Sequence, residues 1–227
     1  MTIRGTIRCR PGTTRARPGT VRYPPPGLNS RHVKIVLIGD GAVGKTSLLT
    51  RYATNEFNSE HEPTIFENCS LDRIIDGRKV ELALWDNAGQ EEFDQIRLLS
   101  YSNIDVFIVV FSVNNQDAFD HVKTKWMPEI LDYAKGVPLM LVGSKCDLRR
   151  VPGIRTSLPE AGTKLARDIN AVAYMECSAK TSEGCSSVFE QAVREALASQ
   201  DHRRAKKGKQ KQSSMSKNIP RDCCLLC

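Results

Sequence analysis

Apolar runs and amphipathic segments alternate along most of this chain. Strand-like segments fall at six places: 33–39, 68–75, 79–85, 104–111, 137–143 and 172–177. Apolar residues at helical spacing fill five segments: 45–54, 91–99, 116–134, 159–170 and 184–198. Strands that alternate with helices in this way predict a three-layer α/β domain, in which about five helices flank a six-stranded and mostly parallel sheet.

The two ends of the chain differ from this domain in charge. Residues 1–32 hold seven arginines, no acidic residue and several prolines, which predicts a disordered basic tail. A mitochondrial transit peptide is a rival interpretation, although the prolines would interrupt its amphipathic helix. Residues 201–227 hold eight Lys or Arg against two acidic residues, whereas residues 33–200 carry a net charge of −6. The overall net charge of +7 therefore describes two basic tails on an acidic domain.

A glycine-rich segment follows the first predicted strand directly. It reads GDGAVGKT at residues 39–46 and fits the pattern G-x-x-x-x-G-K-[ST]. Such a loop points successive backbone N–H groups at phosphate oxygens, and the helix that follows adds its positive dipole end. Lys45 would reach the β- and γ-phosphates, and the Thr46 hydroxyl would bind Mg²⁺. The segment predicts a site for a nucleoside triphosphate.

Three further positions are suited to the γ-phosphate and the metal. Asp86 ends the third predicted strand, where a carboxylate can hold Mg²⁺ through water opposite Thr46. Gly89 can bring its N–H to the γ-phosphate, and the Gln90 amide can orient an attacking water. Thr64 lies in the loop before the second strand, where it can offer a hydroxyl to Mg²⁺ and an N–H to the γ-phosphate.

The segments that follow the fifth and sixth strands predict which base is bound. Asp147 can accept both the ring N–H and the exocyclic amine of guanine, whereas adenine offers no such pair. The Lys145 stem would pack over the base, and the segment 178–180 would give a backbone N–H to the guanine oxygen. A phosphate-loop kinase or ATPase is the competing interpretation, and it predicts a preference for ATP over GTP.

Together these segments resemble the small GTPases of the Rho family within the Ras superfamily. The resemblance spans residues 33–198 and implies a P-loop G domain that is active with GTP and inactive with GDP. It implies a monomer whose partners are exchange factors, GTPase-activating proteins, a prenyl-binding dissociation inhibitor and effectors, with no nucleic acid among them. The segments that carry the resemblance are GDGAVGKTSLL, EPTIFEN, LALWDNAGQEEFDQIRLLSYSNIDVF, KWMPEI, LVGSKCDLR and YMECSAK.

The resemblance also implies roles for individual residues. Catalysis falls to Gln90, Lys45, Thr64 and Gly41, where Gly41 leaves room for Gln90 and for an arginine finger given in trans. The metal ligands are Thr46, Thr64 and Asp86, and effectors bind through 57–68 and 86–100. The residues that contact GTP or GDP are Gly39, Asp40, Gly41, Ala42, Val43, Gly44, Lys45, Thr46, Ser47, Phe57, Thr64, Asp86, Gly89, Ser144, Lys145, Asp147, Ser178, Ala179 and Lys180.

The chain ends in CLLC at 224–227, which fits the C-a-a-X pattern for prenylation of Cys224. One prenyl chain anchors a protein only marginally, so a second signal is expected. The basic residues of 202–211 supply it at an anionic membrane, and Cys223 can add a palmitoyl group. This predicts the cytoplasmic face of the plasma membrane or of other membranes, with a cytosolic pool. A metal-binding or redox tail is the rival interpretation, but no fourth ligand lies nearby.

Four departures from the family pattern bear on nucleotide exchange and partner choice. Ser144 stands where relatives have Asn or Thr, and His61 stands where they have a switch I tyrosine. Asn87 replaces a Thr, with no consequence expected. The helical insert typical of Rho proteins is shortened around 149–158. These departures keep open a second hypothesis, a GTP-dependent binding module that exchanges nucleotide fast and hydrolyses it poorly.

Overall fold

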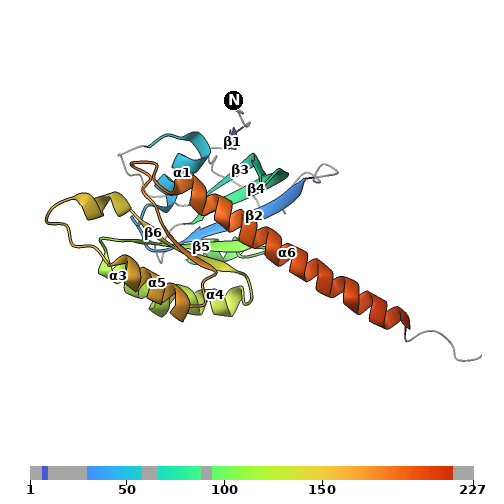
Figure 1. Ribbon diagram of the computed structural model, residues 1–227. Coiled ribbons are helices and arrows are strands. Elements are labelled where there is room, and N and C mark those ends of the chain that lie inside the picture. The colour runs from blue at the N-terminus through green and yellow to red at the C-terminus, as the bar shows by residue number, and fades with distance from the viewer. Residues whose placement is uncertain (1–6, 10–29, 58–65, 88–93, 217–227) are drawn as a thin grey trace, which may run out of the picture.

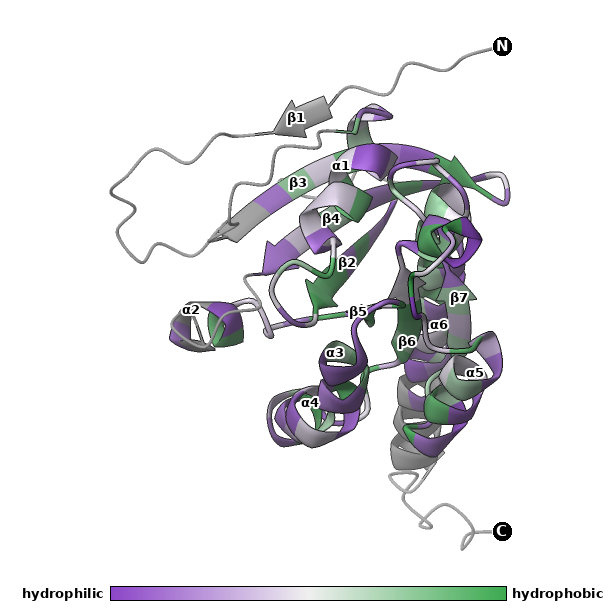
Figure 2. Cartoon of the chain, turned by 90° about the vertical axis from the view of Figure 1, so that its left-hand side faces the viewer, coloured by the Kyte–Doolittle hydropathy of each residue, from purple (hydrophilic) through white to green (hydrophobic). Residues whose placement is uncertain are grey.

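The computed structural model describes residues 7–9, 30–57, 66–87 and 94–216 (Figure 1). A central sheet separates two layers of helices, as the alternating pattern predicted. Figure 2 shows hydrophobic residues gathered on strands such as β2 and β6, while the helices mix hydrophobic and hydrophilic positions. Helices of this kind bury one face against the sheet and leave the other to water.

The sheet contains all six predicted strands, and its order is β1-β3-β4-β2-β5-β6-β7. The pairs β2–β4, β2–β5, β5–β6 and β6–β7 are parallel, while β3 runs antiparallel to β4 across a turn at Asp76 and Gly77. The strand bounds are β2 Arg31–Ile38, β3 Phe66–Ile75, β4 Arg78–Asn87, β5 Val106–Ser112, β6 Leu139–Ser144 and β7 Ala173–Glu176.

A seventh strand comes from the N-terminal tail. The strand β1, Ile7–Cys9, pairs antiparallel with Cys69–Leu71 of β3. The prediction of a tail without regular structure is wrong for this strand and for residues 31–32, which begin β2. Without β1, β3 would be the edge of the sheet and would present a row of unpaired backbone groups, which is a template for one more strand.

The helices α1 and α6 cover one face of the sheet, and α3, α4 and α5 cover the other (Figure 1). The 3₁₀ helix η3 follows β6 and was not predicted. No helix lies at 151–158, in line with the shortened insert. The helix bounds are α1 Lys45–Thr54, α2 Asp94–Leu99, α3 Gln116–His121, α4 Met127–Tyr133, η3 Cys146–Arg150, α5 Pro159–Asp168 and α6 Cys185–Ser216.

The single helix predicted at 116–134 is interrupted by a π-helical turn, η2, at Val122–Trp126. The Met127 N–H bonds the Val122 carbonyl, five residues back. Pro128 follows immediately and has no N–H to give to the preceding turn. A π turn widens the helix at this point, which accommodates the proline without ending the helix.

The last helix is longer than predicted. It was expected to end at residue 198, but α6 continues to Ser216. Residues 199–216 are mostly Gln, Lys, Arg, Ala and Ser, and the single Gly208 costs only about 1 kcal/mol. The first part of this extension is fastened to the domain, since Gln200 donates to the His32 carbonyl at 2.9 Å and Asp201 pairs with Arg31.

The core lies along the central strands, and every residue of β5 is buried. Trp126, Phe107, Phe111 and Phe189 are the largest of its fully buried apolar side chains. None of the helices in the described ranges has both the length and the apolar content needed to cross a bilayer. The carboxyl ends of β2, β4, β5, β6 and β7 meet along one edge of the sheet, where α/β folds bind their ligands.

Candidate nucleotide-binding site

The glycine-rich loop lies between β2 and α1 and depends on two of its glycines. A Cβ on Gly39 would lie 2.0 Å from the Val110 carbonyl oxygen of β5, so only glycine permits this close packing. Gly44 precedes α1 with φ +95°, a left-handed conformation that other residues rarely adopt. Gly41 is exposed at the turn of the loop.

Lys45 is the first residue of α1, and its amine lies inside the loop. Nζ donates to the carbonyl oxygens of Gly39 at 2.7 Å and Asp40 at 2.6 Å. Burial lowers the pKa of Lys45 to about 8, and the nearby carboxylates of Asp86 and Asp40 only partly offset this effect. A bound phosphate would favour the charged amine, so the site is suited to an anion.

The predicted magnesium ligands Thr46 and Asp86 come from adjacent elements. Asp86 is buried near the end of β4, opposite Leu37 of β2 in the parallel register, and Thr46 is the second residue of α1. A hydroxyl and a carboxylate are oxygen ligands of the kind that Mg²⁺ prefers, so this pair fits the metal. The other predicted residues of this group, Thr64, Gly89 and Gln90, lie outside the described residues, as does His61.

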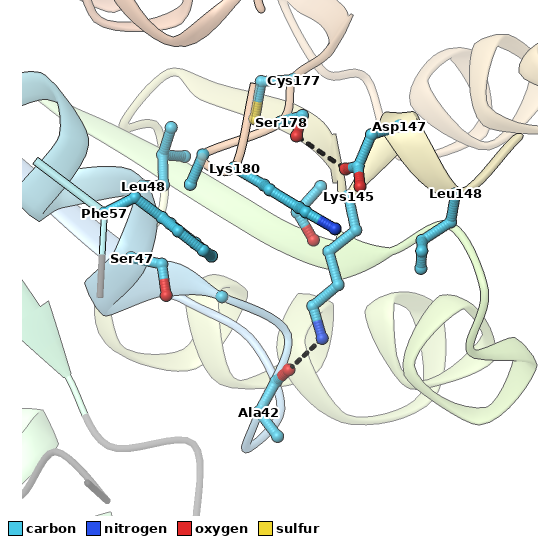
Figure 3. A pocket seen from close by; sticks show the side chains of 13 residues that line it. Ala42, Ser47, Leu48, Phe57, Lys145, Asp147, Leu148, Cys177, Ser178 and Lys180 are labelled. Atoms are coloured by element: carbon cyan, nitrogen blue, oxygen red, sulfur yellow. Dashed lines mark hydrogen bonds between the residues drawn. The ribbon is translucent and has the colours of Figure 1, made fainter. Parts of the chain in front are cut away.

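A cavity of about 420 Å³ opens beside the loop and is large enough for a nucleoside (Figure 3). Most of its lining was predicted from the sequence, including Ser47, Phe57 and Asp147. Leu48, Leu148 and Cys177 were not predicted. The full lining is Ala42, Gly44, Ser47, Leu48, Phe57, Ser144, Lys145, Asp147, Leu148, Cys177, Ser178, Ala179 and Lys180.

Asp147 is held in place by the neighbouring loop. Its Oδ1 accepts a hydrogen bond from the Ser178 hydroxyl at 2.6 Å, and Ser178 is fully buried. The Cys146 N–H also donates to the Cys177 carbonyl at 3.1 Å. The two loops predicted to contact the base are therefore joined before a ligand arrives. The second oxygen of Asp147 takes no part in the Ser178 bond.

Ser144 connects the base loop to the phosphate loop. Its hydroxyl oxygen lies 2.5 Å from the Val43 carbonyl oxygen and 3.0 Å from that of Phe111, and its single proton serves one of them at a time. Lys145 adds a second connection, because its Nζ donates to the Ala42 carbonyl at 2.8 Å (Figure 3). Burial lowers the pKa of Lys145, against the effect of the nearby Asp147 carboxylate. Ser144 thus joins the base loop to the phosphate loop, although relatives have Asn or Thr at this position.

Arg51 of α1 supports the base loop, a contact that no motif in the sequence predicts. Its Nε donates to the Ala179 carbonyl at 2.7 Å, and Nη2 lies 3.4 Å from the Lys180 carbonyl oxygen. Its guanidinium also lies 5.8 Å from the centre of the Phe57 ring. Arg51 thus bonds two carbonyl groups of this loop. A lone arginine on a helix carries no local signal of such a role.

The opposite side of the phosphate loop is held by its aspartate. Trp126 Nε1 donates to Asp40 Oδ1 at 2.8 Å, and His121 Nδ1 lies 2.6 Å from Oδ2. The Arg97 guanidinium lies 4.9 Å from the centre of the Trp126 ring and makes a two-pronged pair with Glu129, at 2.9 and 2.7 Å. A chain of contacts therefore links the phosphate loop to α2.

The end of β4 is joined to the same region. The Asn87 amide, at the position where a Thr was expected, is buried and donates to the Ser100 hydroxyl at 3.1 Å. Tyr101 bonds Glu129 as well, and burial raises the pKa of Tyr101. The C-terminal part of the predicted effector segment 86–100 is therefore fixed against α4.

The shortened connection after η3 is stabilised by one arginine. Arg149 pairs with both carboxylate oxygens of Glu176 at 2.9 and 2.7 Å, and its Nη1 donates to the Thr156 hydroxyl at 3.1 Å. The Ser157 N–H donates to the Val113 carbonyl at 2.7 Å. These bonds hold residues 151–158 against the sheet without a helical insert.

A mostly parallel α/β sheet with a phosphate loop and a guanine-type base pocket defines a P-loop GTPase domain. The model of the Ras family matches residues 34–198. The Rho-related protein racC of Entamoeba histolytica is 44% identical over 183 residues, covering 77% of this chain and 94% of the relative. The GTP-binding protein rho3 of Schizosaccharomyces pombe is 48% identical over 172 residues, covering 74% and 84%.

The chain belongs to the Ras family of small GTPases, and within it to the Rho family. It is accordingly a GTP hydrolase. Proteins of this superfamily generally bind GTP, GDP and Mg²⁺, and Rho proteins generally work with exchange factors, GTPase-activating proteins and effectors. The predictions of family, fold and enzyme class are confirmed, and the roles of individual site residues stay predictions.

Proposed function

We propose that this chain is a lipid-anchored Rho switch that binds GTP with Mg²⁺ and signals to the machinery of cytoskeleton and polarity. In this proposal GTP lies across the phosphate loop with its base in the cavity next to Asp147. Thr46, Thr64 and Asp86 would hold Mg²⁺, which neutralises charge on the phosphates when it is bound. The protein would then present 57–68 and 86–100 to effectors in the GTP state only.

The observation that carries this proposal is the preassembled base pocket. Ser178 orients the Asp147 carboxylate, and Arg51 orients the loop that carries Ala179. A carboxylate fixed in this way distinguishes a base with two adjacent N–H donors from one without them. Guanine binding therefore needs little rearrangement of this wall, which favours firm retention of nucleotide over the fast-exchanging alternative.

In the proposed mechanism, contacts to the γ-phosphate hold the two effector segments, 57–68 and 86–100, in place. Thr64 and Gly89 would donate their N–H groups to it, and Gln90 would orient the attacking water. Hydrolysis removes these contacts and releases the segments. The anchor between Arg97 and Glu129 restricts the rearrangement to the part of 86–100 that precedes it. Beyond the anchor, the Leu99 side chain is 76% exposed and offers an apolar contact to a partner.

The membrane part of the proposal rests on the C-terminal sequence. Cys224 would carry the prenyl group, Cys223 a palmitoyl group, and the basic residues of 202–211 would add about 1 kcal/mol each at an anionic surface. Arg203 is partly engaged already, since it pairs with Asp105 at 2.9 Å. We therefore assign most of the lipid contact to the basic residues after it.

Single-turnover hydrolysis with measured nucleotide off-rates tests the switch. Intrinsic cleavage of GTP is expected on the order of 10⁻⁴–10⁻³ s⁻¹, and a Rho GTPase-activating domain should raise it at least about 10³-fold. The variant Gln90→Leu should lose that acceleration while still binding GTP. Cleavage no faster than in Gln90→Leu, together with rapid nucleotide loss, would favour the fast-exchanging binding module. A competition between GTP and ATP with Asp147→Ala as control tests the base assignment.

Vesicle sedimentation tests the anchor. Protein prenylated in a eukaryotic host should pellet with vesicles that contain phosphatidylserine, whereas Cys224→Ser should remain in the supernatant. Raising the salt concentration should release part of the bound protein, because the basic contribution is screened. Equal binding to neutral and anionic vesicles would remove the basic segment from the proposal.

A further inference from the structure

Two buried thiols lie behind the base pocket and have no role in the proposed switch. Cys177 follows β7 and Cys185 begins α6, and both residues are 1% exposed. The two thiols are close enough for each to shift the pKa of the other. Cys185 Sγ also lies 3.3 Å from the Ser178 carbonyl oxygen, so the pair contacts the loop that orients Asp147.

The backbone brings these thiols together over a short stretch of chain. The Ser178 N–H donates to the Glu183 carbonyl at 2.8 Å, which closes the intervening loop. A Cβ on Gly184 would lie 3.4 Å from both Cα and Cβ of Cys177, so the residue before Cys185 already rests on Cys177. A disulfide requires the two sulfurs to approach to about 2.05 Å, so the chain around Cys177 or Cys185 has to move when the bond forms.

Access to the pair runs through the nucleotide cavity. Cys177 lines this cavity together with Leu48 and Ala179 (Figure 3). Cys177 is 1% exposed, so a small oxidant reaches it when this part of the cavity wall opens locally, and a bound base would oppose that opening. Cys146, next to Asp147 in the sequence, is half-buried, and burial raises its pKa to about 11. It therefore has little thiolate character.

The two thiols of the pair differ in acidity. The hydrogen bond from Cys177 lowers the pKa of Cys185, while the same bond and burial raise the pKa of Cys177. The pair therefore loses its first proton as a unit, with the negative charge shared across one hydrogen bond. This gives it thiolate character that an isolated buried thiol lacks.

We propose that Cys177 and Cys185 form a dithiol that hydrogen peroxide oxidises to a disulfide when the base pocket is empty, and that the disulfide weakens nucleotide binding. One sulfur attacks a peroxide oxygen, the O–O bond breaks, and a sulfenic acid and one water result. The second sulfur then attacks the sulfenic sulfur, the S–O bond breaks, and a second water leaves. Two thiols are oxidised and one peroxide is reduced.

The disulfide affects the nucleotide through Ser178. Forming it draws the two sulfurs together and removes the thiol proton that Cys185 gives to the Ser178 carbonyl. Ser178 is the residue that fixes Asp147, and the Cys177 carbonyl accepts from the Cys146 N–H. Both loops of the base wall therefore shift when the disulfide forms. The oxidised protein is expected to release GDP about tenfold faster, which corresponds to the loss of about one hydrogen bond.

Mass spectrometry after trypsin digestion detects the bond directly. Cleavage after Arg167, Lys180 and Arg194 places Cys177 in peptide 168–180 and Cys185 in peptide 181–194, while Cys146 falls in peptide 146–149. Full-length protein is treated with hydrogen peroxide either as the Mg²⁺–GDP complex or after EDTA has removed the nucleotide. The joined pair 168–180 with 181–194 should form about tenfold faster without nucleotide, because exposure limits thiol oxidation.

The release of a fluorescent GDP analogue is then measured before and after oxidation, and again after dithiothreitol. The oxidised protein should release the analogue faster, and the reductant should restore the original rate. In Cys185→Ala and Cys185→Val, which also lack the thiol donor to Ser178, peroxide should leave the off-rate of each variant unchanged, and two side chains of different volume guard against a packing artefact. Cys146→Ser is the matched control and should retain both the joined pair and the sensitivity.

Three results would overturn the proposal: equal rates of joining with and without GDP, a link that joins Cys146 instead, or an off-rate that peroxide changes equally in the Cys185 variants. The inference rests on the proposed function only in that the nucleotide fills this cavity. The linked peptides are detected by their mass, without any measurement of GTP hydrolysis or membrane binding. If hydrolysis or membrane binding failed, the disulfide could therefore still be tested in the same way.

Discussion

The phosphate loop is held from two sides, and the two sides hold different parts of it. On the base side, Ser144 and Lys145 bond the carbonyls of Val43 and Ala42, which belong to the backbone. On the helix side, Trp126 and His121 bond the carboxylate of Asp40, which is a side chain. The base side therefore fixes the backbone shape of the phosphate loop, while the helix side holds the loop only through the Asp40 side chain.

This difference separates two properties of the switch. Contacts to the backbone keep N–H groups directed at the phosphates, so the base side should control how long nucleotide stays bound. The contacts of Asp40 continue through Trp126 to Arg97 and Glu129, so the helix side should control how firmly α2 is placed. Substitutions on the two sides should then change different measurements. Three substitutions test this, and a pH titration of Lys45, inside the loop, is placed among them in order of decreasing effect.

Replacing Glu129 by alanine should have the largest effect, and it should act on stability. Arg97 is 1% exposed, and the substitution leaves its charge buried without the carboxylate. Breaking such a pair from one end costs about 3–5 kcal/mol of unfolding free energy. Urea unfolding at a fixed GDP concentration measures it, with the exposed Asp132→Ala on the same helix as control. A loss below about 1 kcal/mol would show that the pair does not anchor α2.

Ser144→Ala should act on nucleotide retention instead. It removes the donor to the buried Val43 carbonyl, at a cost of about 1–3 kcal/mol, which corresponds to GDP release about tenfold faster or more. Ser144→Thr keeps the hydroxyl and should stay within a few-fold of the parent rate. An unchanged off-rate in Ser144→Ala, measured with a fluorescent GDP analogue, would contradict the assignment of retention to the base side.

The charge of Lys45 should make nucleotide affinity fall at alkaline pH. Below pH 8 the amine already carries a proton, but above its pKa of about 8 binding must supply one. The affinity for GDP should therefore decrease by up to about tenfold per pH unit above 8 and level off at the ordinary lysine pKa. Titration calorimetry across this range measures the slope. Lys45→Arg is the control, because any titration of the nucleotide itself affects the variant and the parent equally. The variant should lack the additional fall in affinity above pH 8, and the same pH dependence in both proteins would refute the role of the amine.

His121→Ala should have the smallest effect. The His121 side chain is 47% exposed, and exposed pairs contribute about 0–1 kcal/mol. The free energy of unfolding should fall by less than about 1 kcal/mol, while Trp126→Phe, which removes the buried donor to Asp40, should cost about 1–3 kcal/mol, and GDP release should change little in either variant. A larger effect for His121→Ala than for Trp126→Phe would show that the ion pair, and not the indole, holds Asp40.

The parts of the fold that depend on local pattern agree with prediction. The helix α1 begins at Lys45 and ends at Thr54 as predicted, because a left-handed glycine precedes it and Asn55 adopts a left-handed cap after it. The motif residues Ser144, Asp147 and Ser178 do line one cavity. Their spacing along the chain carried that information, because the ends of parallel strands meet at one edge of the sheet.

The rest depends on contacts between distant parts of the chain. Arg51 reaches Ala179 across 128 residues, and Trp126 reaches Asp40 across 86. Neither side chain differs in sequence from an ordinary helix-surface arginine or a core tryptophan. The length of α6 was underestimated for another reason, since its basic residues were taken to mark a solvated tail although most of them are also good helix formers.

The extension of α6 has a consequence for orientation. Beyond Gln200 the helix continues to Ser216, and at 1.5 Å per residue this is a straight segment of about 24 Å. A flexible linker would let the domain turn to any angle, whereas a helix fastened at Asp201 and Arg203 sets both the direction and the distance at which the chain leaves. With Cys224 in a bilayer, the domain and the helix would tilt as one body. Breaking the pair between Arg203 and Asp105 would then change the range of angles at which the effector segments 57–68 and 86–100 face their partners. The nucleotide site would stay unchanged.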